Sequence, residues 1–333
     1  MALPPSTKPI PTTRPLWKRL LLRRLKFLGW IAAILIIVLG GSYLFAPQWL
    51  MQANFTREAM AANLDKHSVQ VGDTKWVYYE GGQGQTIVLL HGLGDSKEVW
   101  LEVAKLLTPH FHLIIPDLPG WGESTRVAGA SYNVDAQAAR LQGFVQVLQM
   151  PRFILVGHSL GGAIAGVYAA EHPDHVSELA LIDSFGLKYK ENAFARDAMA
   201  GKDPFIFDDR AGFERMTALA LDKPLDLPGR FVDVLIKRNQ DDRAFIEQTF
   251  KELSEPSQYL AVQNRLGDLT MPVLGVWCRD DKIIDISALD SLRDGLTHSA
   301  AISSSTLNGC NHIPMLEKPD ATAQILTGFA LSH

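Results

Sequence analysis

Cysteine is scarce in this sequence, since only Cys278 and Cys310 occur among its 333 residues. This number excludes a framework of several disulfides and a cysteine-rich zinc site. The ten histidines form no H-E-x-x-H motif and no paired ligand spacing, and no glycine-rich loop ends in Lys-Ser or Lys-Thr. The sequence therefore predicts neither a bound metal nor a cofactor.

Acidic residues are missing between Met1 and Trp30, where seven basic residues occur. Because the whole chain has a formal net charge of −4, the part after Trp30 is more acidic than that value suggests. A nucleic-acid-binding domain needs positive charge on its folded surface, so we expect no nucleic-acid partner.

Charged residues are also missing from Phe27 to Ala46, a run long enough to cross the roughly 30 Å hydrocarbon layer of a bilayer. A buried helix of that length would carry polar residues on one face, and a cleaved signal peptide would have a shorter apolar region ending in a small-x-small site. We therefore expect a transmembrane anchor at 27–46 after a basic cytoplasmic stub at 1–26. By the positive-inside rule, the remaining chain is periplasmic or otherwise extracytoplasmic.

After the anchor, the spacing of Met51, Phe55, Ala59 and Ala62 predicts a juxtamembrane helix within 47–66. Its apolar face lies either along the bilayer or against the folded domain. Gly40 and Gly41 are adjacent rather than spaced as in helix-association motifs, so the oligomeric state is left open.

From about His67 onward, short apolar runs rich in β-branched residues alternate with helical patterns. The runs are KWVYY (75–79), TIVLL (86–90), HLIIP (112–116), FILV (153–156), ELALI (178–182), VLGVW (273–277) and AISSS (301–305). Continuous apolar runs of this kind are typical of strands that are buried on both faces of a mostly parallel sheet. The sequence therefore predicts an α/β core from segments 67–185 and 267–333.

The strand pattern is interrupted at 186–266, where helical stretches such as RFVDVLIKR take over. This segment predicts a helical cap, or lid, over the carboxyl ends of the strands, where ligands of open α/β sheets bind. We expect about half of its large apolar residues to line a route for an acyl chain and the others to pack the cap. They are Phe205, Ile206, Phe207, Leu225, Leu227, Phe231, Val232, Leu235 and Ile236.

The segment GHSLG (157–161) lies between the apolar run FILV and the small-residue stretch GGAIAGVYAA, as in a nucleophile elbow. A serine hydroxyl needs a base to take its proton, and the base needs a carboxylate partner. Ser159, Asp281 and His312 occur in the order Ser, Asp, His and are our candidate catalytic residues. Asp280 and Asp183 remain alternatives for the acid.

The segment HGLG (91–94) directly follows the run TIVLL. Backbone N–H groups in such a loop stabilise the oxyanion that forms when serine attacks a carbonyl group. We assign this oxyanion hole to the N–H groups of Leu93 and Leu160. Near the other end of the chain, Cys278 and Cys310 flank the proposed acid and base. They either form a disulfide in an oxidising compartment or remain two buried thiols.

The segments HGLGDS, DLPGWGES (117–124), GHSLGG and NHIPMLEKP occur in the order found in the α/β-hydrolase superfamily, which the chain resembles over residues 67–333. More narrowly, QWLMQANF, HGLGDSKEVW, FHLIIPDLPGWGEST and LALIDSFGL resemble bacterial lipases and phospholipases A with one N-terminal membrane helix, and the related monoacylglycerol lipases. The resemblance implies an α/β-hydrolase fold and a serine esterase that hydrolyses acylglycerols or (lyso)phospholipids through an acyl-enzyme. Relatives usually have Gly where this chain has Cys278, which leaves the choice between Asp280 and Asp281 open.

Other functions remain open on this fold. Epoxide hydrolases and haloalkane dehalogenases use Asp at the elbow, so Ser159 excludes them. Carbon–carbon hydrolases and cofactor-free haloperoxidases keep Ser and stay as alternatives, together with a non-catalytic binding module. The expected partners are a lipid or small ester substrate and the membrane.

Overall fold

The computed structural model describes residues 16–333, and the predicted stub therefore lies partly outside the described residues. The chain forms two units, Met1–Met51 and Gln52–His333, which are described separately. In the first unit, helix α1 (Leu16–Phe45) has no buried residue. Among residues 16–333 it is the one helix long and apolar enough to cross a membrane.

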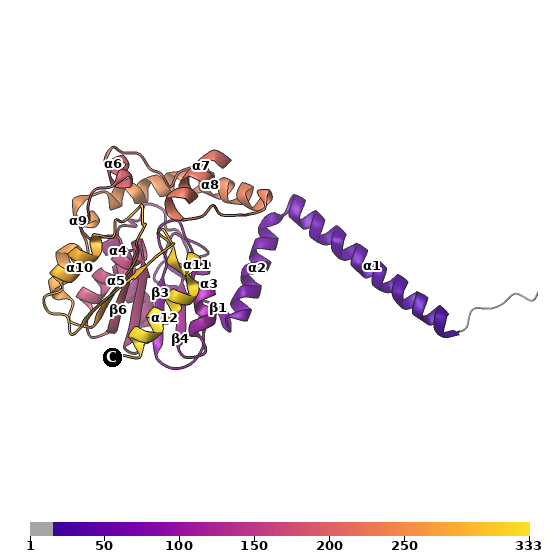
Figure 1. The fold of residues 1–333 in the computed structure, drawn as a ribbon, viewed down its shortest axis with the longest axis horizontal. Helices are drawn as coiled ribbons and strands as arrows, with labels where there is room; N and C mark the ends of the chain where they lie inside the picture. The colour runs from indigo at the N-terminus through magenta and orange to yellow at the C-terminus, as the bar shows by residue number, and fades with distance from the viewer. Residues whose placement is uncertain (1–15) are drawn as a thin grey trace, which may run out of the picture. The chain divides into compact units, whose positions relative to one another are not determined.

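The second unit is built on an eight-stranded sheet with the order β1-β2-β4-β3-β5-β6-β7-β8 (Figure 1). Strands β1 and β2 run antiparallel to their neighbours, and the remaining pairs are parallel. The predicted mostly parallel sheet is thereby confirmed. The strands are β1 (Leu64–Val71), β2 (Thr74–Gly81), β3 (Thr86–Leu90), β4 (His112–Pro116), β5 (Phe153–His158), β6 (Val176–Ile182), β7 (Val273–Cys278) and β8 (Ile302–Leu307).

Strand β1 was not predicted, and it begins inside the segment 47–66 that we expected to be helical. It pairs with β2 across a tight turn in which Gly72 has a φ of +58°. Because β1 forms the edge of the sheet and most of its side chains are exposed or half-buried, it lacks the continuous apolar run that marks the central strands β3 to β7. The helix before it, α2 (Pro47–Ala61), ends three residues earlier than Leu64.

Helices cover both faces of the sheet, and alternate strand residues enter two separate cores. In β5, Leu155 belongs to one core, whereas Ile154 and Val156 belong to the other. Within the second unit, Phe55 and Ala59 of α2 pack into the core that also holds α3 and α12. The helices of the two layers are α3 (Leu101–Leu107), α4 (Val134–Val147), α5 (Leu160–Glu171), α10 (Ala288–Gly295), α11 (Pro314–Glu317) and α12 (Pro319–Ala330), with the 3₁₀ helix η1 (Lys97–Trp100) before α3.

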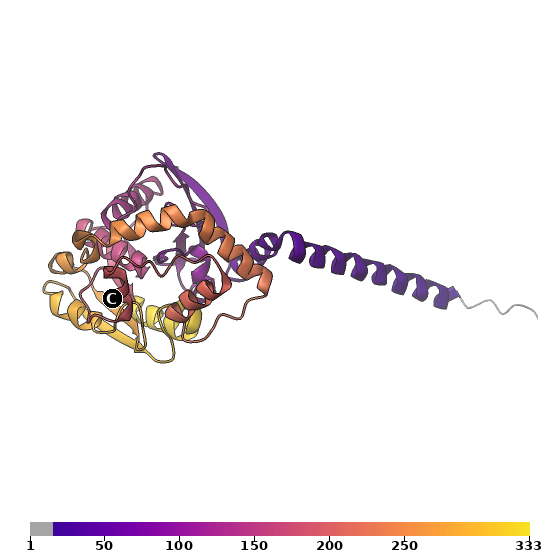
Figure 2. The ribbon, with the colours of Figure 1, turned by 90° about the horizontal axis from the view of Figure 1, so that it is seen from above.

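Between β6 and β7 the chain forms a separate helical layer, whose helices α6, α7 and α8 lie over one end of the strands in Figure 1. Seen from above in Figure 2, α8 extends across these strand ends. The elements are α6 (Ala193–Met199), α7 (Arg210–Ala220), α8 (Gly229–Leu253), α9 (Pro256–Tyr259) and the 3₁₀ helix η2 (Gln263–Asp268). We call residues 186–266 the cap from here on.

Candidate active site

Ser159 occupies a sharp turn between β5 and α5, with a φ of +51° that is unusual for a residue with a side chain. The turn brings the chain back so closely that a Cβ at Gly157 would lie 2.2 Å from the carbonyl oxygen of Gly161. A Cβ at Gly161 would lie 2.4 Å from the carbonyl oxygen of His91. Glycine is therefore required at both positions, and the strained backbone holds Ser159 at the carboxyl end of the central strand β5.

Ser159, Asp281 and His312 are far apart in the sequence. The structure brings the three side chains together. His312 Nε2 lies 3.0 Å from Ser159 Oγ, and His312 Nδ1 lies 2.9 Å from Asp281 Oδ2. Asp281 Oδ1 also accepts the backbone N–H groups of Ile283 and Ile284. The carboxylate is therefore held with one oxygen on the backbone and the other on the imidazole.

The alternative acids lie elsewhere. Asp280 is exposed, and no contact of its side chain with His312 is present among residues 16–333. Asp183 follows β6 and is fully buried; its Oδ1 accepts the N–H of Cys278 at 2.9 Å. Burial, followed by the charge of Asp281, raises the pKa of the Asp183 carboxyl well above its ordinary value. Of the three carboxyl groups, Asp281 alone contacts His312.

His91 fixes the loop in which we expect the oxyanion hole. Its Nε2 accepts the N–H of Leu118 at 2.9 Å, so the proton is on Nδ1, which donates to the carbonyl oxygen of Gly92 at 2.8 Å. In the described chain, the N–H groups of Leu93 and Leu160 have no acceptor. Two backbone donors beside Ser159 are therefore available to a ligand.

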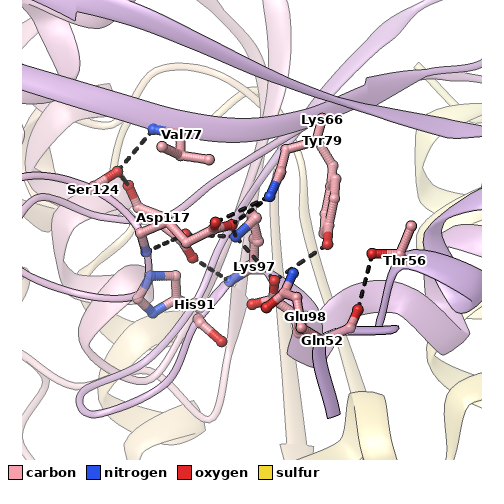
Figure 3. Close-up of polar contacts among 12 residues, drawn as sticks. Gln52, Thr56, Lys66, Val77, Tyr79, His91, Lys97, Glu98, Asp117 and Ser124 are labelled. Carbon is pink, nitrogen blue, oxygen red and sulfur yellow. Dashed lines mark hydrogen bonds and ion pairs between the residues drawn. The ribbon is translucent and has the colours of Figure 1, made fainter. Parts of the chain in front are cut away.

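Figure 3 shows a buried ionic network behind this loop, centred on Lys97. The fully buried ammonium of Lys97 contacts Asp117 at 2.7 Å and Glu98 and Glu123 at 2.9 Å each. Burial alone would lower the pKa of Lys97, but the charges of Asp117 and Glu98 raise it above its ordinary value. Asp117 Oδ1 also accepts the Lys97 N–H, so the network joins loop 91–97 to loop 117–124.

His158 is a residue of the site that the sequence analysis missed, because position 158 is variable in the elbow pattern. It is buried, and its Nε2 lies 2.7 Å from the carbonyl oxygen of His312. A carbonyl oxygen only accepts, so Nε2 carries the proton. Burial, with a further contribution from His312, lowers the pKa of His158 well below its ordinary value. His158 is thus a neutral donor that holds the backbone of His312.

Cys278 and Cys310 form a disulfide, which is one of the two alternatives that the sequence left open. The bridge joins the end of β7, just before the Asp281 loop, to the loop that carries His312. Asn311 adds a second link, since its Oδ1 accepts the N–H of Lys282 and its Nδ2 donates to the carbonyl oxygen of Leu219 at 2.8 Å.

The loop of His312 is also bonded to the cap. The N–H of His312 donates to the carbonyl oxygen of Ala220 at 2.9 Å, at the end of α7. Together with the bond from Asn311 to Leu219, two hydrogen bonds join the loop of His312 to the end of α7.

Ser159 lies where two cavities meet. The larger, about 270 Å³, is also lined by His312 and by apolar side chains of the cap, among them Phe205, Phe207 and Leu235. The smaller, about 60 Å³, is almost wholly apolar and includes Leu93 and Leu160. Of the nine cap residues that we considered for an acyl route, Phe205, Phe207, Leu225 and Leu235 line the larger cavity; Val232, Leu227 and Ile236 pack within the cap.

Comparisons with known proteins identify the family of the chain. The α/β-hydrolase fold family matches residues 85–218. Lipase 1 of Psychrobacter immobilis is 31% identical over 77% of this chain and 80% of its own length. Monoacylglycerol lipase ABHD6 of Homo sapiens is 29% identical over 91% of this chain and 93% of its own length. A crystal structure of a membrane phospholipase A, described as a bacterial virulence factor, is 32% identical, has a TM-score of 0.80 and covers 95% of this chain and 98% of that one.

The chain therefore belongs to the α/β-hydrolase fold family, as its sequence predicted. Its relatives identify it further as a serine ester hydrolase.

Proposed function

We propose that this protein is a membrane-anchored lipase that cleaves carboxylic esters of acylglycerols or (lyso)phospholipids. The observation that carries the proposal is the continuous chain Ser159, His312 and Asp281, with contacts of 3.0 and 2.9 Å, at the wall of an apolar cavity. The lipases and the phospholipase A among its relatives support the choice of a lipid ester.

In the first half of the reaction, Ser159 Oγ attacks the ester carbonyl carbon while His312 Nε2 takes the hydroxyl proton. Asp281 accepts a hydrogen bond from His312 Nδ1–H, which keeps Nε2 free as the base and stabilises the imidazolium. The carbonyl oxygen becomes an oxyanion, which the N–H groups of Leu93 and Leu160 bind. His312 then gives its proton to the leaving alcohol oxygen, and the acyl group stays on Ser159.

In the second half, a water molecule replaces the alcohol. His312 takes a proton from this water as the water oxygen attacks the acyl carbon, and the same N–H groups hold the second oxyanion. When the intermediate collapses, the bond from the acyl carbon to Ser159 Oγ breaks, and His312 returns the proton to Oγ. The fatty acid leaves, and the enzyme is restored.

The cavities support an acyl substrate. Each methylene group that leaves water for an apolar wall contributes about 0.8 kcal/mol of favourable transfer free energy. The cap supplies such a wall through Phe205, Phe207, Leu225 and Leu235. One cavity then holds the acyl chain and the other the alcohol part, with the ester carbon at Ser159.

We also propose that α1 anchors the enzyme with its N-terminus in the cytoplasm and the second unit on the opposite side. The basic residues at the start of α1 favour this orientation. The disulfide between Cys278 and Cys310 supports it, because disulfides persist in the oxidising periplasm or cell exterior. A lipid substrate partitions into the bilayer, so the anchor raises its local concentration.

The proposed chemistry is tested with detergent-solubilised full-length protein on p-nitrophenyl esters, monoacylglycerols, lysophospholipids and diacyl phospholipids, measuring released fatty acid. We expect Ser159→Ala to lose at least about a thousandfold in kcat/KM. Asp281→Asn should lose a comparable factor because it disturbs the tautomer of His312.

Asp280→Asn is the matched control, since it makes the same chemical change one residue away on an exposed side chain. It should retain activity close to that of the wild type. If no ester is hydrolysed by the wild type, the proposed function is wrong. If Asp280→Asn rather than Asp281→Asn is inactive, the assignment of the acid is wrong.

A further inference from the structure

Asp183 is a buried acid with no part in the reaction described so far. It follows β6, the strand between those that carry Ser159 and Asp281, and it has a φ of +43°. Its backbone N–H donates to the carbonyl oxygen of Val276, and its Oδ1 accepts the N–H of Cys278. The strained backbone and both bonds fix the direction of the carboxyl group.

The second carboxyl oxygen of Asp183 is the unusual one. Oδ2 is buried and receives no hydrogen bond from any donor in the described chain. The neighbouring carboxyl of Asp281 raises the pKa of Asp183 through its negative charge and as a hydrogen-bonding partner, and the charge of Glu317 in α11 raises it further. Two ionised carboxylates only accept, so they repel and leave Oδ2 without a partner. A single proton shared by the two carboxyl groups removes their repulsion and gives Oδ2 a hydrogen-bonding partner.

The proton belongs on Asp183 rather than on Asp281. Asp281 already accepts three N–H groups, those of Ile283, Ile284 and the His312 ring, and these bonds favour its ionised form. Asp183 accepts one N–H and is completely removed from solvent. Burial and the neighbouring charge of Asp281 raise its pKa.

We propose that Asp183 is a positioning residue, a neutral carboxylic acid that donates a hydrogen bond from Oδ2 to Asp281 and so orients the acid of the triad toward His312. The proposal rests on the proposed function, since it assigns Asp281 as the partner of the base. The donated bond also disperses part of the charge on Asp281. Asp183 therefore limits how strongly Asp281 stabilises the imidazolium of His312.

The direct test is independent of activity. Infrared difference spectra of the full-length wild type minus Asp183→Asn at pH 7 should contain the carbonyl stretch of a protonated carboxyl group, shifted to lower frequency in D₂O. If the difference contains carboxylate bands alone, Asp183 is ionised and the proposal is overturned. A failure of ester hydrolysis would leave this spectrum unchanged, so the two failures are distinguishable.

The kinetic test compares two variants by the pH dependence of kcat/KM, with active sites counted by a phosphonate that labels Ser159. Asparagine tolerates positive φ and donates an N–H to Asp281 as the neutral acid does. Asp183→Asn should therefore keep kcat/KM within about threefold of the wild-type value. The acidic limb of its pH profile should lie at the same pH as that of the wild type. Asp183→Leu has a similar shape but no donor, and should lose about tenfold in kcat per active site.

The direction of the shift in Asp183→Leu follows from charge. Without the donor, Asp281 keeps its full negative charge and stabilises the imidazolium more, so the acidic limb should move to higher pH. An ionised Asp183 predicts a different result, because Asp183→Asn would then remove a negative charge and move the limb to lower pH. A shift of the acidic limb to lower pH in Asp183→Asn overturns the proposal. An Asp183→Leu variant whose acidic limb and kcat equal those of the wild type also overturns it.

Discussion

At the scale of single residues, His158 shows how a side chain outside the proposed triad sets its geometry. Its Nε2 proton holds the carbonyl oxygen of His312 at 2.7 Å, so it fixes the backbone of the base rather than its ring. We expect His158→Leu to lower kcat about tenfold with little change in KM, because one hydrogen bond that holds the base is lost. His158→Gln, whose amide N–H donates as well, should recover part of the rate. Equal kcat values for the two variants on p-nitrophenyl butyrate would contradict this role.

The candidate residues were predictable to different degrees. Ser159, Asp281 and His312 were found because their chemistry depends on a fixed chain order, and the structure places them in contact. Their catalytic role stays a prediction until the variants are measured. His158 and Asp183 carry no motif, because their roles depend on which atoms meet across strands, and chain order does not encode that.

At the scale of elements, the sequence runs predicted seven strands of the sheet, including the largely exposed edge strand β8. The runs of β3 to β7 are largely apolar because these strands are buried on both faces. Strand β1 was missed for the complementary reason. At the edge of the sheet its side chains face solvent, so charged and polar residues are tolerated and the strand resembles a loop in the sequence. The turn at Gly72, directly before β2, was the signal that it is half of a hairpin.

The disulfide is the element that joins the acid loop to the base loop. In the chain-entropy model, a bridge across 32 residues stabilises the folded state by about 3–4 kcal/mol. We expect the double variant Cys278→Ser with Cys310→Ser to lose about this free energy of unfolding, measured with urea. A reductant should destabilise the wild type to the same level and leave the double variant unchanged. If the reductant lowers the free energy of unfolding of both proteins equally, its effect does not come from breaking the disulfide.

At the scale of the whole molecule, the division into two units separates the proposed membrane anchor from the proposed catalytic residues. The second unit begins at Gln52 and contains Ser159, His312, Asp281 and both cavities. We expect a protein without residues 1–46 to move from the membrane to the soluble fraction and to keep its kcat/KM on a soluble p-nitrophenyl ester. Its rate on lipid in vesicles should fall, because the substrate is confined to the bilayer.

The full-length protein, reconstituted into the same vesicles, is the control for this deletion. Equal loss on the soluble and the vesicle substrates would mean that the first unit contributes to folding or to the site itself. Retention of the truncated protein in the membrane would mean that attachment does not depend on α1.

The two hydrogen bonds between the end of α7 and the loop of His312 join the wall of the larger cavity to the proposed catalytic base. Leu219 and Ala220 belong to the helix end that borders the larger cavity, and their carbonyl oxygens hold Asn311 and His312. A displacement of α7 would pull on the loop of His312 through these two bonds and lengthen the 3.0 Å contact between His312 Nε2 and Ser159 Oγ. We therefore expect the position of the cap and proton transfer from Ser159 to change together.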